Sequence, residues 1–160
     1  CQQNNFISMC DFYRVTGSCK FGNSCTKQHT VPQLSNTVML ENVMPAIKTT
    51  NPIIANSFKL NVFEDLCLKC AEFGRFAKAV ISQNMNHLYG NFYVQFFDLQ
   101  DAKKFQEKMK QEFYCGVQIT CRFVEMNMLQ RAVCQTKGCN ENKCNYLHLL
   151  NTKEIDFTKM

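Results

Sequence analysis

The chain has 160 residues, a net charge of +5 and eleven cysteines. This length suits one ordinary domain with small attachments. The sequence contains no run of about 18 apolar residues, the length that could cross a membrane, and we expect no signal peptide. Lys and Arg outnumber Asp and Glu by three to one in residues 1–36, ten to nine in residues 37–125 and five to three in residues 126–160. A polyanionic partner is therefore expected at the two ends and not along the middle.

Residues 1–36 are predicted to form a small metal-binding module. Three cysteines and a histidine follow the spacing C-x8-C-x5-C-x3-H, at Cys10, Cys19, Cys25 and His29. Three thiolates and one imidazole complete a tetrahedral shell for zinc and leave no open position for a substrate. The pattern predicts a structural zinc finger, not a catalytic metal centre.

Strand-like and helix-like segments alternate between residues 37 and 125. Residues 37–44 predict a first strand. Apolar residues at helical spacing predict a helix over residues 57–73. We expect Asn56 or Ser57 to cap its start, and Gly74 to form a left-handed cap at its end.

The second half of this region continues the alternation. Residues 76–81 and 91–96 predict two strands, the latter rich in aromatic and β-branched residues. Asp98 is the expected cap of a second helix that runs to about Lys110, and alternation over residues 117–123 predicts a fourth strand. The order β-α-β-β-α-β is that of the ferredoxin-like fold. We therefore predict an α+β domain of the RNA-recognition-motif type over residues 37–125.

Residues 126–160 are predicted to form a second zinc finger with a C-terminal tail. The same ligand order returns with the spacing C-x4-C-x4-C-x3-H, at Cys134, Cys139, Cys144 and His148. Two closed shells predict two zinc ions per chain.

The five cysteines outside the two metal patterns are Cys1, Cys67, Cys70, Cys115 and Cys121. Their odd number, and the apolar segments in which most of them lie, favour reduced and buried thiols over disulfides. Such thiols are typical of cytosolic or nuclear proteins. Cys67 and Cys70 form C-x-x-C inside a predicted helix, where core thiols are expected and a redox pair is not.

The central sheet has lost most of the rings on which an RNA-recognition motif stacks bases. Asn91 stands where the third strand usually has an aromatic residue, and Met39 stands at the corresponding place in the first strand. Only Tyr93 keeps a stacking position. One ring in place of two or three makes a poor stacking platform, since each stacked base contributes ~1–3 kcal/mol. We therefore expect this domain to bind another partner rather than RNA.

The order of finger, degenerate RNA-recognition motif and second finger resembles the small subunit of the U2 auxiliary factor over nearly the whole chain. Local matches are CDFY at residues 10–13, GNFYV at residues 90–94 and CNYLH at residues 144–148. The resemblance implies a nuclear pre-mRNA splicing factor subunit that recognises the AG of the 3′ splice site in single-stranded RNA. It implies no enzymatic activity, no small-molecule substrate and no membrane partner.

The resemblance also implies that the central domain is a U2AF-homology motif. Such a domain binds a tryptophan-containing peptide of the large subunit in a pocket between its two helices, forming a heterodimer. Tyr114 matches the stacking aromatic of the family's Arg-x-Phe motif, and Phe113 matches a family tryptophan that packs into the partner. Glu112 stands where the family has the arginine, which reverses the charge at that position. Glu64 and Asp65 match acidic residues on the family's first helix.

Rings and cations of the fingers are the candidate RNA contacts, since Cys3His fingers stack unpaired bases on exposed aromatics. The first finger offers Phe12, Tyr13, Arg14, Lys20, Phe21 and Lys27, and the second offers Arg131, Lys137, Lys143 and Tyr146. Thr26 matches a small hydroxyl residue that the family carries close to RNA. Phe12 and Tyr146 could instead cover the zinc sites, and Phe113 and Tyr114 could be ordinary packing.

Two other functions compete with this one. A Cys3His RNA-binding protein of mRNA processing or decay is the first, and the degenerate central motif argues against it. A zinc-dependent hydrolase is the second. Closed metal shells, without H-E-x-x-H or a deaminase signature, disfavour it.

Overall fold

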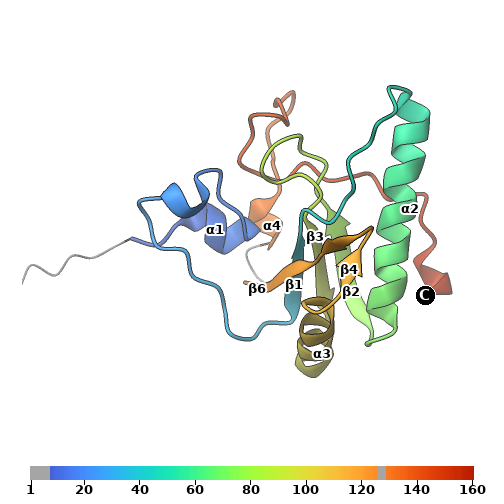
Figure 1. The fold of residues 1–160 in the computed structure, drawn as a ribbon, viewed down its shortest axis with the longest axis horizontal. Coiled ribbons are helices and arrows are strands. Elements are labelled where there is room, and N and C mark those ends of the chain that lie inside the picture. The colour runs from blue at the N-terminus through green and yellow to red at the C-terminus, as the bar shows by residue number, and fades with distance from the viewer. Residues whose placement is uncertain (1–7, 126–128) are drawn as a thin grey trace, which may run out of the picture.

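The computed structural model describes residues 8–125 and 129–160 and is built on a four-stranded antiparallel sheet with the order β2-β3-β1-β6. The strands are β1 Thr37–Glu41, β2 Phe76–Ile81, β3 Phe92–Phe96 and β6 Thr120–Val124. The helices are α1 Asp11–Thr16, α2 Pro52–Ala71, α3 Leu99–Met109 and α4 Leu129–Ala132, with 3-10 turns η1 Gly22–Ser24 and η3 Phe157–Lys159. Helices α2 and α3 flank the sheet on one side, and α1 and α4 lie on the other (Figure 1).

This arrangement confirms the predicted ferredoxin-like α+β domain between two Cys3His groups. The predicted domain boundaries after residues 36 and 125 stay predictions. Residues 1–7, with Cys1, and residues 126–128 lie outside the described part of the chain. Among the described residues, no helix combines the length and apolar character needed to cross a bilayer.

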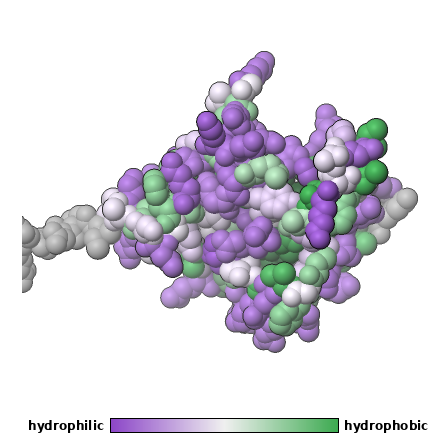
Figure 2. Space-filling model, turned by 45° about the horizontal axis from the view of Figure 1, so that its top comes forward, coloured by the Kyte–Doolittle hydropathy of each residue, from purple (hydrophilic) through white to green (hydrophobic). Residues whose placement is uncertain are grey.

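Helix α2 begins earlier than predicted. Its N-cap is Asn51, not Asn56 or Ser57, and the Asn51 side-chain oxygen accepts hydrogen bonds from the N–H groups of Ile53 and Ile54 at 3.0 and 3.3 Å. The prediction was wrong because Ile53 and Ile54 are exposed, so the apolar stripe begins only further along the helix. Figure 2 shows apolar groups on the surface at this end of the molecule.

The end of α2 also differs from the prediction. Glu72 follows the helix with right-handed backbone angles, and Gly74 has a φ of 159°, outside the left-handed cap region. Both its backbone conformation and the space beside it favour glycine at this position. A Cβ here would lie 2.1 Å from the Asp101 carboxylate of α3.

The middle of the domain agrees with the prediction. Strand β2 spans the predicted residues 76–81, and β3 begins at Phe92, one residue later than expected. Asp98 caps α3, since its carboxylate accepts the N–H of Gln100 at 2.7 Å.

The predicted fourth strand, residues 117–123, is two separate elements. Residues Val117–Gln118 (β5) pair with Phe113–Tyr114 (β4) in a small hairpin, and only β6 joins the sheet, beside β1. The turn residues Cys115 and Gly116 have φ values of 49° and 80°. Two positive values suit a tight hairpin turn. The prediction was wrong because Cys-Gly is a weaker turn signal than Asn-Gly, so the alternation read as one strand.

Apolar side chains fill the layer between the sheet and helices α2 and α3. Phe63 of α2 lies 5.9 Å from Phe92, and Phe105 of α3 lies 5.3 Å from Phe96, measured between ring centroids. All four rings are buried. The aromatic residues of the predicted strand and helices therefore form one core.

The cysteines outside the metal groups are free thiols where the structure describes them. Cys67 and Cys70 are fully buried in the core, as predicted, and burial raises the pKa of Cys67 to about 12. Cys121 is half-buried. Cys115 departs from the expectation, because it is exposed at the tip of the β4–β5 hairpin.

The opposite face of the sheet is covered as well. Met39 and Tyr93 have no exposed surface, and they pack in a second apolar cluster with Val15, Leu129 and Leu147 from the two ends of the chain. The prediction that Tyr93 keeps a stacking position was therefore wrong. The face on which an RNA-recognition motif stacks bases is filled by the protein's own end segments.

The C-terminal segment passes from this face to the helix layer along the β2 edge. The N–H of Leu150 donates to the carbonyl of Ile81 at 3.0 Å. Phe157 in η3 then packs edge-on against Phe63 of α2, with 6.1 Å between ring centroids. The chain end consequently lies beside α2 (Figure 1).

Candidate RNA interface and zinc centres

The first metal-ligand group surrounds helix α1. Its members are Cys10, Cys19, Cys25 and His29. Gly17 ends α1 in the left-handed conformation, with φ 75°, and its N–H donates to the carbonyl of Tyr13. This cap turns the chain back toward the start of the helix. The N–H of Cys10 donates to the carbonyl of Gln28 at 2.9 Å, which brings the first ligand beside the last.

The second group is closed in the same way by the backbone. Its members are Cys134, Cys139, Cys144 and His148. The N–H of Cys134 donates to the carbonyl of Leu147 at 2.9 Å, and the N–H of Leu147 donates to the carbonyl of Ala132 at 2.7 Å. Gly138, with φ 70°, lies in the short loop between the first two ligands.

Both groups fit zinc. In each, one ligand atom from every member lies within 4.8 Å of the others. The Nε2 atoms of His29 and His148 are buried and have no hydrogen-bond partner within the described residues, as expected of nitrogens that face a metal. Three thiolates and one imidazole form the closed tetrahedral donor set of a structural zinc ion. The chain therefore has two zinc sites, which cross-link segments that are too small for a core of their own.

Tyr13, a predicted RNA contact, lies against a zinc ligand. Its ring stacks on the imidazole of His29, with 4.2 Å between centroids and 1° between planes. The guanidinium of Arg122 on β6 lies 5.2 Å from the Tyr13 centroid. Arg122 also donates to the carbonyl of Gly17 at 2.6 and 2.9 Å and pairs with Glu41 at 2.9 Å. Tyr13 thus joins the zinc ligand to the sheet.

Polar side chains of β3 and the residue before it hold the first finger on the sheet. The Asn91 amide group donates to Ser18 Oγ at 3.1 Å, and its oxygen accepts the N–H of Asn42 at 2.9 Å. The Tyr93 hydroxyl donates to the carbonyl of Thr16. Burial raises the pKa of Tyr93 far above its usual range, so the phenol remains a donor. Asn91, at a position where an RNA-recognition motif usually has a stacking ring, therefore holds the first finger on the sheet.

Two asparagines after β2 hold the second finger. The Asn84 amide group donates to the carbonyl of Tyr146 at 2.9 Å, and its oxygen accepts the N–H of His148 at 2.8 Å. Asn86 donates to the carbonyl of Cys144 at 2.8 Å. Both fingers are thus fixed on the same domain.

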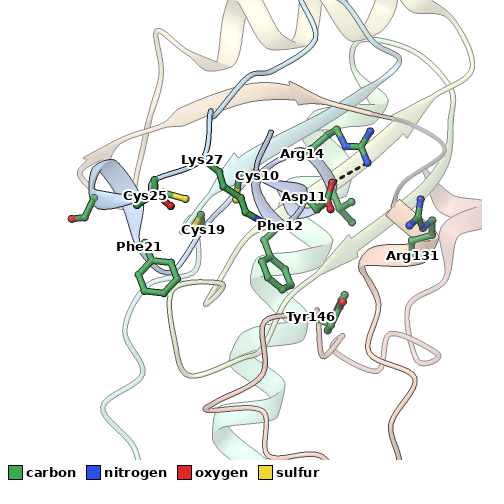
Figure 3. Close-up of a pocket in the computed structure, with 13 residues that line it drawn as sticks. Cys10, Asp11, Phe12, Arg14, Cys19, Phe21, Cys25, Lys27, Arg131 and Tyr146 are labelled. Atoms are coloured by element: carbon green, nitrogen blue, oxygen red, sulfur yellow. Dashed lines mark hydrogen bonds and ion pairs between the residues drawn. The ribbon is translucent and has the colours of Figure 1, made fainter. Parts of the chain in front are cut away.

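The fingers meet above the sheet, and residues of both enclose one cavity. The rings of Phe12 and Tyr146 meet edge to face, with 5.6 Å between centroids. Beside them lies a cavity of about 580 Å³ (Figure 3). Its lining includes the zinc ligands Cys10, Cys19 and Cys25 of the first finger, together with the predicted RNA contacts Phe12, Arg14, Phe21, Thr26, Lys27, Arg131 and Tyr146. Phe21 and Tyr146 are 57% and 44% exposed, so a ligand can reach both rings.

Other predicted contacts lie outside this lining. The Lys20 ammonium lies 4.9 Å from the centroid of the Phe21 ring, and Lys137 and Lys143 are exposed on the second finger. Asp11, which the sequence did not single out, lines the cavity and lies 3.2 Å from the Arg14 guanidinium. A carboxylate is not expected where a polyanion binds, which is why the charge pattern did not select Asp11.

The predicted partner-binding residues gather around the β4–β5 hairpin and α2. Phe113 is 65% exposed, and Glu64 is exposed on α2. The Tyr114 hydroxyl donates to the Asp65 carboxylate at 3.0 Å, and burial together with this carboxylate raises the pKa of the phenol. Glu112 pairs with Lys108 of α3 at 2.8 Å. The hydrogen bond from Lys108 lowers the Glu112 pKa.

Tyr114 also lines a second cavity, of about 800 Å³. Its other walls are residues 41–46, the hairpin with the two residues after it, and the side chains of Asn86, His87 and Tyr89. This cavity lies on the β1 side of the hairpin. The pocket between α2 and α3 that the resemblance implies stays a prediction.

Residues 8–26 match the family described as "Zinc finger C-x8-C-x5-C-x3-H type (and similar)". Over 92% of its length, the chain is 24% identical to human "U2 small nuclear ribonucleoprotein auxiliary factor 35 kDa subunit-related protein 2". Over 88% of its length, it is 25% identical to the Drosophila melanogaster "Splicing factor U2af 38 kDa subunit" and 28% identical to an Arabidopsis thaliana splicing factor named as a U2af small subunit. The chain spans 35%, 60% and 53% of these three relatives.

Two solved structures with sequence identities of 18% and 15% are also similar. The RRM3 domain of Gbp2 has a TM-score of 0.42, covering 59% of this chain and 82% of the domain. The RNA15 RRM has a TM-score of 0.41, covering 61% of this chain and 98% of that structure.

Proposed function

We propose that this chain, a divergent relative of the U2 auxiliary factor small subunits, binds single-stranded pre-mRNA at the 3′ splice site as one half of a heterodimer. The observation that carries the proposal is the single cavity lined by residues of both fingers. The metal shells are closed, and the relatives are named as splicing factors. The chain is accordingly a binding protein and not an enzyme.

The cavity between the fingers has the features that unpaired RNA requires. Phe12, Phe21 and Tyr146 offer rings for stacking bases, and Arg14, Lys27 and Arg131 offer cations for phosphates. An RNA strand that enters here contacts both fingers at once. The sheet makes no stacking contact, because Tyr93 and Met39 are buried beneath the fingers.

The AG dinucleotide is the proposed target because the relatives are U2 auxiliary factor small subunits and related proteins. Such a task places the protein in the nucleus. The alternative task is mRNA processing or decay by another kind of Cys3His protein. None of the three relatives reported above is named as such a protein.

Titration of the zinc-loaded chain with labelled RNA tests this proposal. A short single-stranded RNA that ends in AG should bind more tightly than the same RNA ending in CU, and more tightly than its duplex. Removing zinc should abolish binding, since the fingers lose the cross-links that shape the cavity. Equal binding to the duplex, or binding that survives zinc removal, would contradict the proposal.

The proposed partner is the large subunit of the auxiliary factor, through a tryptophan-containing peptide. Phe113 is exposed in the hairpin, and Tyr114 is held on α2 by its hydrogen bond to Asp65. An exposed aromatic beside a fixed one suits an aromatic anchor. The acidic residues of α2 suit a basic segment next to the tryptophan.

A binding assay with such a peptide tests the partner. Phe113→Ala and Tyr114→Ala should each weaken binding by about 2–4 kcal/mol, the size of an anchor contact. The matched control is Phe97→Ala, because Phe97 is 64% exposed and Phe113 is 65% exposed. If Phe97→Ala weakens binding as much as Phe113→Ala, the hairpin is not the partner site.

A further inference from the structure

The loop between β2 and β3, residues 82–91, contacts both zinc fingers and is built into the interior of the protein. Two backbone hydrogen bonds close its base. The N–H of Ser82 donates to the carbonyl of Asn91 at 2.9 Å, and the N–H of Gly90 donates to the carbonyl of Ser82 at 3.0 Å. Ser82, Asn84 and Asn91 are polar and yet have no exposed surface. A connecting loop usually runs over the surface, so the burial of these side chains asks for a reason.

The first half of this loop fixes two zinc ligands of the second finger. The Asn84 side-chain oxygen accepts the N–H of His148 at 2.8 Å, and the N–H of Gln83 donates to the carbonyl of His148 at 2.8 Å. Asn86 donates to the carbonyl of Cys144 at 2.8 Å. Because a buried amide without partners is costly, Asn84 is stable in this position only when the second finger is folded against it.

The second half of the loop holds the first finger. The Asn91 amide group donates to Ser18 Oγ at 3.1 Å, and Ser18 directly precedes the zinc ligand Cys19. Leu88 is fully buried in an apolar cluster that contains side chains from both fingers. One closed loop therefore supports the ligand-bearing backbone of both zinc sites.

We propose that this loop couples the two zinc sites, so that closing one ligand set prepares the other. Ordering the loop costs conformational entropy, and a folded finger on either side holds the loop in the place that the other finger needs. Asn84, Asn86 and Asn91 are positioning residues, which act through the backbone of the ligand segments. The coupling is the same in both directions by linkage. It goes beyond the proposed function, since it concerns zinc loading and requires no RNA.

The fingers also touch each other directly, which offers a second route for coupling. The rings of Phe12 and Tyr146 meet with 5.6 Å between centroids. The two routes use different residues. Removing the Phe12 ring breaks the direct contact and keeps the loop, whereas removing the Asn84 amide does the reverse.

Zinc titration of the metal-free full chain, in competition with a chelator under reducing conditions, tests the coupling. Cys19→Ser and Cys134→Ser each leave one complete ligand set. The two zinc association constants of these variants multiply to the overall constant expected of independent sites. The wild-type constant should exceed this product by about 5- to 150-fold, the usual size of coupling between two sites. A wild-type constant equal to the product would overturn the inference.

Two variants decide whether the loop carries the coupling. Asn84→Ala removes the acceptor of the His148 N–H and should bring the ratio between the two constants close to one. Asn86→Ala, at a half-buried position that is easier to change without unfolding, removes the donor to Cys144 and should lower the ratio. The matched control is Asn51→Ala, because the Asn51 side chain also holds backbone groups but does so at the start of α2 in the helix layer. It should keep the wild-type ratio.

Phe12→Ala separates the loop from the direct ring contact and should also keep the wild-type ratio. If Phe12→Ala lowers the ratio while Asn84→Ala and Asn86→Ala keep it, the fingers couple through their rings and the inference is wrong. It is equally wrong if both loop variants weaken zinc binding in the second finger and leave the ratio unchanged, because the loop then supports that finger locally and does not connect it to the first.

Discussion

Single residues that do not bind zinc hold the zinc ligands in place. Tyr13 stacks on His29, and Arg122 links Tyr13 to Glu41 on the sheet. Partners of this kind fix the orientation of a ligand ring before the metal binds. The fingers are therefore expected to depend both on their cysteines and on the sheet beneath them.

Cys19→Ser is expected to lose one zinc ion per chain, because it removes a thiolate from a closed shell. Metal analysis of the purified protein should give about one zinc per chain in place of two. Cys115→Ser is the control, since Cys115 is an exposed thiol outside both ligand groups. Two zinc ions retained in Cys19→Ser would remove Cys19 from the ligand set.

Tyr93→Phe is expected to affect stability and not RNA affinity. It keeps the buried ring but leaves the carbonyl of Thr16 without its donor. A buried group that loses its partner costs about 1–3 kcal/mol of unfolding free energy. Denaturant unfolding and RNA titration of the same variant separate the two effects. A large loss of RNA affinity with unchanged stability would show that Tyr93 contacts RNA after all.

How far single residues could be predicted depended on how local their signal is. The zinc ligands follow a linear spacing, so the sequence identified both sets. The role of Tyr93 depends on a hydrogen bond to a residue 77 positions away, which no local pattern contains.

At the scale of helices and strands, apolar periodicity predicted the elements that pack on the core. It predicted β2 and α3 well because their buried residues recur at regular spacing. It missed the first turns of α2, where Ile53 and Ile54 are exposed and the start is set by Asn51. It also predicted β5 and β6 as one strand, because Cys-Gly is a weak sequence signal for the β4–β5 turn, which has two positive φ values.

The start of α2 gives a direct test at this scale. Asn51→Ala should lower the unfolding free energy by about 1 kcal/mol, because two N–H groups lose their acceptor. Asn56→Ala should leave it unchanged or raise it slightly, since Asn56 lies inside the helix and alanine favours helices. Urea unfolding of both variants measures the difference. A larger loss of unfolding free energy in Asn56→Ala than in Asn51→Ala would indicate that Asn56 is the N-cap, as the sequence predicted.

At the scale of the whole molecule, the two fingers share one face of one domain. The sequence indicated that this face had lost its stacking rings, and the structure gives the reason, because both fingers pack on it. Which finger contacts which loop could not be predicted, since those contacts join Asn84 and Asn86 to a segment about 60 positions away. The cavity between the fingers is a consequence of this packing.

The central claim is that RNA binds in one cavity shared by both fingers, and a double-mutant cycle on Phe12 and Tyr146 tests it most directly. Each change to alanine should cost about 1–3 kcal/mol of RNA binding free energy, since each ring is expected to contact the same strand. The double variant should lose less than the two losses added together, by at least about 0.5 kcal/mol, because the rings act in one site. Losses that add fully, or a single variant that binds RNA like the wild type, would contradict a shared cavity.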